Sequence, residues 1–403
     1  MEETHLPSDL TRIAMLRQLM GHTSDNIYFM DRKGRIILIS HWGAKWLGYD
    51  SPESVIGKTD FDLFSEEHAA AAFADEQRIM ETGEPVIGIE EKETWPDGRV
   101  TWVSTTKMPL RDDHGNIIGI FGISRDITVH KEREILVNQM KEQMELELSR
   151  ASEVQRSFLA ARRITYPDKP STGAGSIEVI HEYRPSGPVG GDFFCLLPLS
   201  ETRVGILIAD VMGHGVGAAL TVSALNAMAR SEAARLSKPD AFLERLNRRL
   251  REVISREEVF EFITAFYLVI DTADGSLSFA TAGHHSPLIM EAGTNRSRRL
   301  FEHDDIKGPA LMLIPEPSFA TGESELMSGD RLLLFTDGLT EMPSSRDSED
   351  DLGIEGLIEL LGSVRREGLA DLVSGIAAAV LELSGAKKFN DDLCLIGVEY
   401  RNT

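Results

Sequence analysis

The chain has 403 residues, of which 42% are hydrophobic, and a formal net charge of −23. This length suffices for two or three domains with separate cores. The acidic balance argues against nucleic acid or an anionic membrane as partner, because both require a basic surface. No run approaches the roughly 20 apolar residues of a membrane-spanning helix, and the first residues (MEETHLPSDL) lack a signal-peptide pattern. We therefore expect a cytoplasmic protein with no nucleic-acid or membrane partner.

The first segment, residues 1–20, is predicted to be a short amphipathic helix. Apolar residues recur there at helical spacing, and Ser8 and Asp9 precede them as possible caps. Cys195 and Cys394 both lie inside apolar, strand-like runs. We expect them to be small buried hydrophobes rather than a redox pair.

Residues 21–130 alternate strands and turns: two strands, a mixed segment, then three strands joined by turn signals at 96–98 and 112–116. The stretches DNIYFMDRKGRIILIS, GKTDFDLF, WPDGRVTWV and GIFGISRDIT make this block resemble a PAS sensor domain. The resemblance implies an antiparallel sheet with helices that senses a small ligand or binds proteins, and it leaves the ligand unknown. The block contains no cysteine, which excludes flavin photochemistry through a cysteinyl adduct.

The segment from Lys131 to Ile164 has no glycine or proline and predicts one long helix, within a linker over 131–165. Its apolar positions alternate at spacings of three and four, interrupted only by Glu147. This period favours a dimeric, left-handed coiled coil over a solitary amphipathic helix. The stripe comprises Val137, Met140, Met144, Ala151, Val154 and Phe158.

Residues 170–403 are predicted to form one compact domain. A hairpin is expected from Thr264–Asp271 and Ser276–Ala282, across the turn 272–275. Hairpins mixed with helices favour antiparallel sheets covered by helices. Further strands are predicted at 177–183, 193–197, 204–209, 288–290, 331–336 and 393–398, and helices at 215–236, 239–254, 353–364 and 369–383.

Several aspartates stand at the ends of these strand-like runs. Asp192 and Asp210 each lie at the end of an apolar run with glycines close by, Asp337 lies in FTDG, and Asp391 and Asp392 precede the last strand. A single aspartate of this kind is usually a turn residue. Because a buried carboxylate needs a cationic partner, their joint presence favours a shared carboxylate site.

Five motifs in this domain are YRPSGPVGGDFF, ILIADVMGHGVGAALTVSALNAM, TAFYLVIDTADGSLSFATAGHHSPL, GDRLLLFTDGLTE and NDDLCLIGVE. In order and spacing they resemble the SpoIIE-like (RsbU/RsbP-type) branch of the metal-dependent, 2C-type serine/threonine phosphatases, over residues 175–400. With the sensor block and linker, the whole chain resembles an RsbP-type stress-response phosphatase. The fold class implied is α+β and multidomain: a PAS fold, a coiled-coil linker and an α-β-β-α sandwich.

The resemblance also implies a site for two Mn²⁺ or Mg²⁺ ions. Asp210 would bridge both ions with help from the carbonyl of Val211, and Asp192, Asp337 and Asp391 would complete the catalytic set, with Asp392 as the alternate to Asp391. His214 is either a proton donor or a structural turn residue, and Arg184 either binds phosphate or is an ordinary surface arginine. Cys195 stands where many relatives carry another aspartate, which leaves the number of metals open.

The function implied is a PAS-regulated protein serine/threonine phosphatase that acts on a phosphorylated STAS-type anti-sigma factor antagonist. Dimerisation is expected through the PAS domain and the coiled-coil linker. The alternative is a catalytically inactive phosphatase fold that serves as a binding module under PAS control. An acidic segment, Pro343 to Asp351, is expected to be either a flap beside the site that selects the docking protein or a solvated loop with no role.

Overall fold

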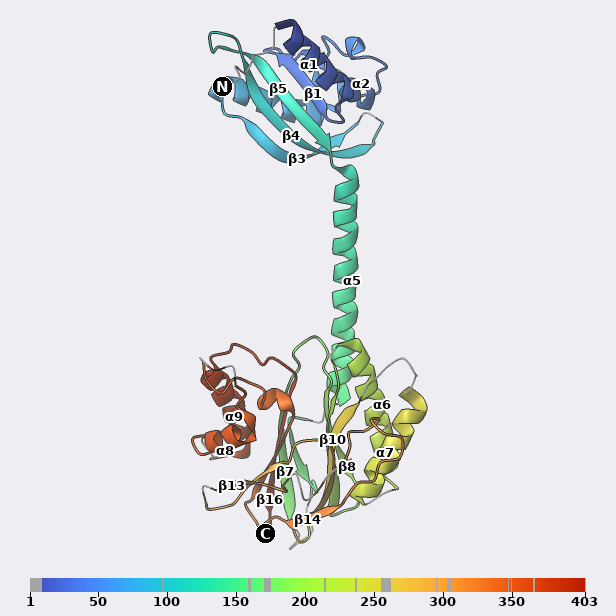
Figure 1. The fold of residues 1–403 in the computed structure, drawn as a ribbon, viewed down its shortest axis with the longest axis vertical. Coiled ribbons are helices and arrows are strands. Elements are labelled where there is room, and N and C mark those ends of the chain that lie inside the picture. The colour runs from blue at the N-terminus through green and yellow to red at the C-terminus, as the bar shows by residue number, and fades with distance from the viewer. Residues whose placement is uncertain are drawn as a thin grey trace, which may run out of the picture. The chain divides into compact units, whose positions relative to one another are not determined.

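The computed structural model describes residues 9–95, 97–158, 161–169, 175–213, 215–235, 238–254, 262–294, 296–302, 306, 308–346, 348, 350–364 and 367–402. The chain divides into two compact units, 1–143 and 144–403, and Figure 1 labels many of their elements. No helix in the described ranges is long and apolar enough to cross a membrane.

The N-terminal unit is built on a five-stranded antiparallel sheet with the order β2-β1-β5-β4-β3. Its core packs between this sheet and α4, around Tyr28, Ile39, Ile79 and Ile120, all of which are buried. This is the arrangement expected of a PAS fold. The elements are α1 Asp9–His22, β1 Asn26–Asp31, β2 Ile36–Ile39, α2 His41–Trp46, η1 Pro52–Ser54, α3 Asp60–Leu63, α4 Glu66–Thr82, β3 Val86–Thr94, β4 Val100–Arg111 and β5 Ile117–Asp126.

The predicted lead-in helix is present as α1, although residues 1–8 lie outside the described part of the chain. Met20 is its buried residue, whereas Leu10, Leu16 and Leu19 are exposed. The apolar face of α1 is therefore left without a partner within its own unit among the described residues.

The linker helix is shorter at its end than predicted. Helix α5 runs from Thr128 to Phe158, and residues Arg163–Tyr166 form strand β6 instead of helix. Ile164 pairs with Val179 of β7 and packs against the core of the C-terminal unit. The prediction of helix up to Ile164 was wrong. It relied on the absence of glycine and proline from this segment, and pairing with a neighbouring strand overrides such a local helical preference.

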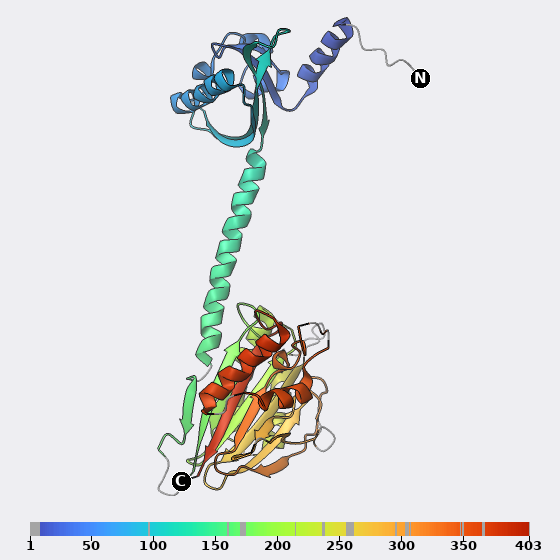
Figure 2. The same ribbon diagram turned by 90° about the vertical axis from the view of Figure 1, so that its left-hand side faces the viewer.

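The C-terminal unit is an α-β-β-α sandwich, which confirms the fold predicted for this domain. Sheet I has the order β14-β11-β10-β9-β8, and sheet II has the order β13-β12-β15-β16-β7-β6. Helices α6 and α7 cover sheet I, while α8 and α9 cover sheet II (Figures 1 and 2). The elements are β7 Ser176–Arg184, β8 Asp192–Pro198, β9 Arg203–Val211, α6 Val216–Ala233, α7 Pro239–Ile254, β10 Ile263–Asp271, β11 Ser276–Ala282, β12 Leu288–Met290, β13 Ser297–Arg299, β14 Gly322–Glu325, β15 Arg331–Phe335, η2 Asp337–Leu339, α8 Gly353–Leu361, α9 Leu369–Ser384 and β16 Leu393–Arg401.

The alternation of side chains along each strand separates three layers of core. On β9, Ile206 and Ile208 face sheet II, while Leu207 and Ala209 face the helices of sheet I. The predicted strands and helices of this unit are observed with shifts of a few residues at their ends. Strands β6, β13 and β14 were not predicted, because they are short and two of them are largely polar.

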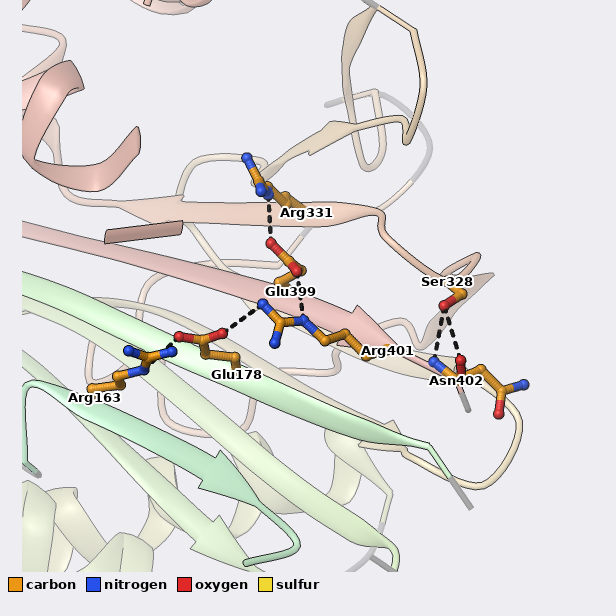
Figure 3. Close-up of polar contacts among 7 residues, drawn as sticks. All are labelled: Arg163, Glu178, Ser328, Arg331, Glu399, Arg401 and Asn402. Carbon is orange, nitrogen blue, oxygen red and sulfur yellow. Dashed lines mark hydrogen bonds and ion pairs between the residues drawn. The ribbon is translucent and has the colours of Figure 1, made fainter. Parts of the chain in front are cut away.

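The helices cover only one end of the outer face of sheet II. At the other end an alternating chain of arginines and glutamates crosses β6, β7, β16 and β15 (Figure 3). Glu178 and Glu399 are buried, and each is held between two arginines. The contacts are Arg163–Glu178 at 2.7 Å, Glu178–Arg401 at 2.8 Å, Arg401–Glu399 at 2.7 Å and Glu399–Arg331 at 2.7 Å. This ion-pair ladder therefore ties β6, the strand that follows the linker, into the sheet.

Candidate active site

Sheet I supplies two facing carboxylates at one end of the sandwich. Strands β8 and β9 are antiparallel, and their register places Asp192 directly opposite Asp210. Both side chains share the face of Phe194 and Ile208, which points toward sheet II. Directly opposed residues have Cβ atoms about 5 Å apart, so the strand register itself brings the two carboxylates together.

Sheet II brings its aspartates to the same end. Strand β15 ends at Phe335, which pairs with Leu395 near the start of β16, so Asp337 follows one strand where Asp391 and Asp392 precede the other. A Cβ at Gly338 would lie 1.9 Å from the carbonyl oxygen of Asp392. Only glycine permits this approach, which explains the glycine that follows Asp337 in the sequence.

A hydrogen bond joins the two halves of the site. The Thr336 hydroxyl donates to Asp192 Oδ2 at 2.6 Å and accepts from the backbone N–H of Cys394 at 2.9 Å. Thr336 is fully buried. It therefore fixes one oxygen of Asp192 and leaves the other available toward Asp210.

The pKa values of these carboxyl groups are raised because the groups are buried close to one another. Burial raises the pKa of Asp192 well above its usual range, and the charge of Asp210 raises it further. Burial, followed by the charges of Asp337 and Asp391, raises the pKa of Asp210 to about 7. Burial likewise raises the pKa of Asp337, with a smaller opposing effect from His285. Carboxylates placed in this way favour a bound cation.

The doublet at the start of β16 divides into two roles. Asp392 is buried, and its Oδ1 accepts hydrogen bonds from the Ser186 N–H at 2.6 Å and the Ser186 hydroxyl at 2.9 Å. Its Oδ2 accepts from the Gly191 N–H at 2.6 Å. Asp391 is exposed, and its Oδ1 accepts a local hydrogen bond from the N–H of Asp392 at 2.7 Å. Asp392 thus holds the loop before Asp192, while Asp391 remains open to an ion.

The donor set suits a hard cation. In the described ranges, no three His, Cys, Asp or Glu side chains are grouped closely enough to hold an ion unaided. Mg²⁺ and Mn²⁺ prefer oxygen ligands, and Mg²⁺ usually keeps several waters. Asp192, Asp210, Asp337 and Asp391, together with the carbonyl of Val211, could hold such ions with water completing the coordination. The residues present therefore fit divalent ions.

Of the two candidate substrate-binding residues, Arg184 and His214, the structure describes Arg184. Arg184 ends β7, and its Nε donates to Glu182 Oε1 at 2.7 Å while its guanidinium lies 5.8 Å from the centre of the Phe389 ring. This arginine is therefore already engaged by neighbours at the rim of the site. His214 lies outside the described residues.

Residues that the sequence analysis did not single out also shape the site. They are Thr336, Ser186 and Gln155, whose side chain bonds to the backbone of Gly190. Of these three residues, only Thr336 could have been recognised from the sequence, because it stands next to Asp337 in the FTDG motif. Hydrogen bonds from a distant helix to a loop backbone leave no pattern in the sequence.

Comparisons with known proteins agree with this architecture. Residues 200–401 match the family described as Stage II sporulation protein E (SpoIIE), and residues 20–132 match the PAS fold. The chain is 26% identical over 226 residues to phosphoserine phosphatase RsbP of Bacillus subtilis (strain 168), covering 56% of this chain and 53% of RsbP. It is 25% identical over 259 residues to phosphoserine phosphatase RsbU of the same strain, covering 64% of this chain and 71% of RsbU.

Among solved structures, the SiaA-PP2C domain of Pseudomonas aeruginosa shares the fold, with a TM-score of 0.52 and 20% identity. The match covers 64% of this chain and 98% of that domain. The chain thus spans an entire PP2C-type domain but only about half the length of RsbP.

Proposed function

Because the chain belongs to the SpoIIE family, we propose that it is a metal-dependent protein phosphatase that hydrolyses phosphoserine or phosphothreonine. The observation that carries this proposal is the register of Asp192 against Asp210, faced by Asp337 and Asp391 from the second sheet. Phosphate monoester hydrolysis is among the slowest uncatalysed reactions. It therefore requires a site that concentrates positive charge around the phosphoryl group.

We assign Asp192, Asp210, Asp337, Asp391 and the carbonyl of Val211 as ligands of two Mn²⁺ or Mg²⁺ ions. When bound, such ions activate a water and neutralise the charge of the phosphoryl oxygens. The protein's own residues orient the ligands: Thr336 holds Asp192, and Asp392 holds the Ser186–Gly191 loop. Asp392 therefore acts as a positioning residue rather than as a ligand.

The substrate that we propose is a phosphorylated STAS-type anti-sigma factor antagonist. RsbP and RsbU are both named phosphoserine phosphatases, and the RsbU/RsbP-type resemblance implies this partner class. The acidic segment 343–351 would contribute to the selection of the protein partner. Its base is closed by a bridge between Pro343 and Asp351, beside η2.

We propose that the PAS unit regulates this activity in a homodimer. Val137, Met140, Met144 and Val154 of α5 are each more than half exposed, and an apolar stripe of this kind on a helix is typical of a coiled-coil seam. The PAS unit also encloses a cavity of about 40 Å³ whose lining includes Asn26, Asp60, Glu93 and Lys107. This polar cavity is where a small signal, of unknown identity, would act.

The proposal is tested by Mn²⁺-dependent hydrolysis of a chromogenic phosphate ester by the full chain. We expect turnover by the wild type and by Asp371→Asn, an exposed acidic control on α9. We expect none from Asp337→Asn. A wild type that folds and binds Mn²⁺ but hydrolyses neither the ester nor a phosphorylated STAS protein would support the alternative, an inactive binding module.

A further inference from the structure

His284 occupies the junction between the two sheets. It follows β11 and is 4% exposed. Its backbone is fixed by Thr281, whose hydroxyl donates to the His284 carbonyl at 3.0 Å and accepts from the His284 N–H at 3.1 Å. Gly283 provides the turn with a φ of +72°, where other residues would be strained. The imidazole is therefore held rigidly.

The two ring nitrogens of His284 have partners on different sheets. Nε2 lies 3.1 Å from the carbonyl oxygen of Phe335, on sheet II. Because a carbonyl oxygen can only accept, Nε2 carries the ring hydrogen and donates the hydrogen bond. Nδ1 lies 2.8 Å from the hydroxyl of Thr264, on sheet I, and accepts from it. Burial lowers the pKa of His284 to about 3, so the ring stays uncharged and this tautomer persists.

Both partners are adjacent to the carboxylates. Thr264 is the cross-strand neighbour of Asp210, and Phe335 precedes Thr336 and Asp337, the first of which holds Asp192. The ring thus connects the backbone that carries Asp337 with the strand beside Asp210. A buried polar network of this kind fixes geometry when every member is satisfied.

We propose that His284 is a positioning residue: a brace that sets the spacing between the carboxylates of sheet I and those of sheet II, and thereby the affinity of the site for its divalent ions. This inference rests on the proposed function. It assigns His284 no contact with substrate or metal. Its effect is exerted through Thr264 and the Phe335 backbone.

The test is Mn²⁺ binding to the full chain by titration calorimetry, alongside urea denaturation followed by far-ultraviolet circular dichroism. We compare His284→Ala with Asn247→Ala. Asn247 is a matched control because it is 1% exposed and makes three hydrogen bonds to backbone groups of Met312, Ile314 and Pro315 on α7's side of sheet I. Both variants lose buried hydrogen bonds, but only His284 joins the two sheets.

We expect His284→Ala to weaken Mn²⁺ binding about tenfold, in the range known for groups that orient metal ligands, while Asn247→Ala changes it less than about twofold at a comparable loss of stability. Thr264→Val should also weaken binding. The double variant should bind no more weakly than His284→Ala alone, because the hydroxyl acts through the ring. Should His284→Ala fail to fold, His284→Gln, which keeps a donor for Phe335, replaces it.

Equal Mn²⁺ affinities in the His284 and Asn247 variants, or additive losses in the double variant, would overturn the brace. Either result leaves the proposed function intact as long as the wild type binds Mn²⁺ and hydrolyses the ester. Failure of the wild type in both measurements would instead refute the proposed function.

Discussion

Gln155 and Gly190 exchange a reciprocal pair of hydrogen bonds. The Gln155 Nε2 donates to the Gly190 carbonyl oxygen at 2.6 Å, and the Gly190 N–H donates to Gln155 Oε1 at 3.1 Å. Gln155 is the buried residue of α5, all of which the structure describes. Gly190 precedes Asp192 by two residues, so the last turn of the linker helix holds the loop that leads to Asp192, one of the proposed metal ligands.

Replacing Gln155 by alanine should uncouple the linker from the site. The change leaves two buried backbone groups without partners, and each costs roughly 1–3 kcal/mol if the loop keeps its position. We expect the loop to relax instead, with about a tenfold loss of ester hydrolysis and weaker Mn²⁺ binding. Gln139→Ala, an exposed glutamine on the same helix, is the control. Identical activity in the two variants would contradict the coupling.

Inserting residues after Glu145 tests whether rotation of the linker matters. One residue turns the helix by about 100°, whereas seven residues nearly restore the seam. We expect the single insertion to change hydrolysis and the Mn²⁺ requirement, and the seven-residue insertion to resemble the wild type. Wild-type behaviour in both insertion variants would show that the linker is a passive tether.

Asp210→Asn should abolish turnover and leave the fold intact. Even changes to groups that orient metal ligands cost roughly 10- to 100-fold, so we expect more than about a hundredfold loss. Removing one of several facing carboxylates also relieves repulsion, and the variant should be at least as stable as the wild type in EDTA. Urea denaturation checks this. Near-normal turnover at saturating Mn²⁺ would refute the role of Asp210.

The stability of the PAS unit should fall as the pH rises. Burial raises the pKa of Glu93 to about 8, although a hydrogen bond from Thr101 opposes the shift. The folded state thus retains a proton that the unfolded chain releases near pH 4.5, so unfolding free energy declines between about pH 5 and pH 8 by roughly 3–5 kcal/mol. Glu93→Gln should make this slope shallower and leave the part that comes from Glu76, whose pKa burial raises to about 7.

Tryptophan fluorescence measures the effect selectively, because the four tryptophans, Trp42, Trp46, Trp95 and Trp102, all belong to this unit. Trp95 also donates to Thr101 Oγ1 at 2.8 Å, next to Glu93. Glu84→Gln, at an exposed position, serves as control and should keep the wild-type slope. A slope as steep in Glu93→Gln as in the wild type would place its origin elsewhere.

Deleting residues 345–350 should alter turnover of a protein substrate by severalfold and leave ester hydrolysis within about twofold. The segment belongs to a loop closed by Pro343 and Asp351. It contains none of the proposed metal ligands, so we expect it to contact the protein partner rather than to take part in the chemistry. Turnover of a phosphorylated STAS protein and of the ester, measured in parallel, separates the two effects. Equal losses would indicate that the segment supports the site itself.

The sequence predicted the parts of the fold whose side chains alternate or run continuously apolar. Strands β9 and β10 were recognisable because their burial is nearly complete. Strand β6 was not, because Arg163 and Thr165 face outward and its order depends on pairing with β7 and on the contact between Arg163 and Glu178. Such partners lie outside any local window.

The candidate carboxylates, too, could be predicted only as far as local sequence allows. Their presence could be predicted from motifs, but the different roles of Asp391 and Asp392 depend on Ser186, about two hundred residues away. The same holds for His284, which reads as a turn residue until its two ring partners are known. Sequence position alone does not reveal which acceptor atoms are already occupied.

The place of β6 at the edge of sheet II decides how the C-terminal unit should be isolated. A recombinant fragment starting at residue 170 would omit β6 and expose the hydrogen-bonding edge of β7, which is a template for association between copies. It would also leave Glu178 with Arg401 as its remaining ion-pair partner within the ladder and remove Gln155 from Gly190. A fragment starting at residue 144 retains the edge strand, the complete ladder and the glutamine.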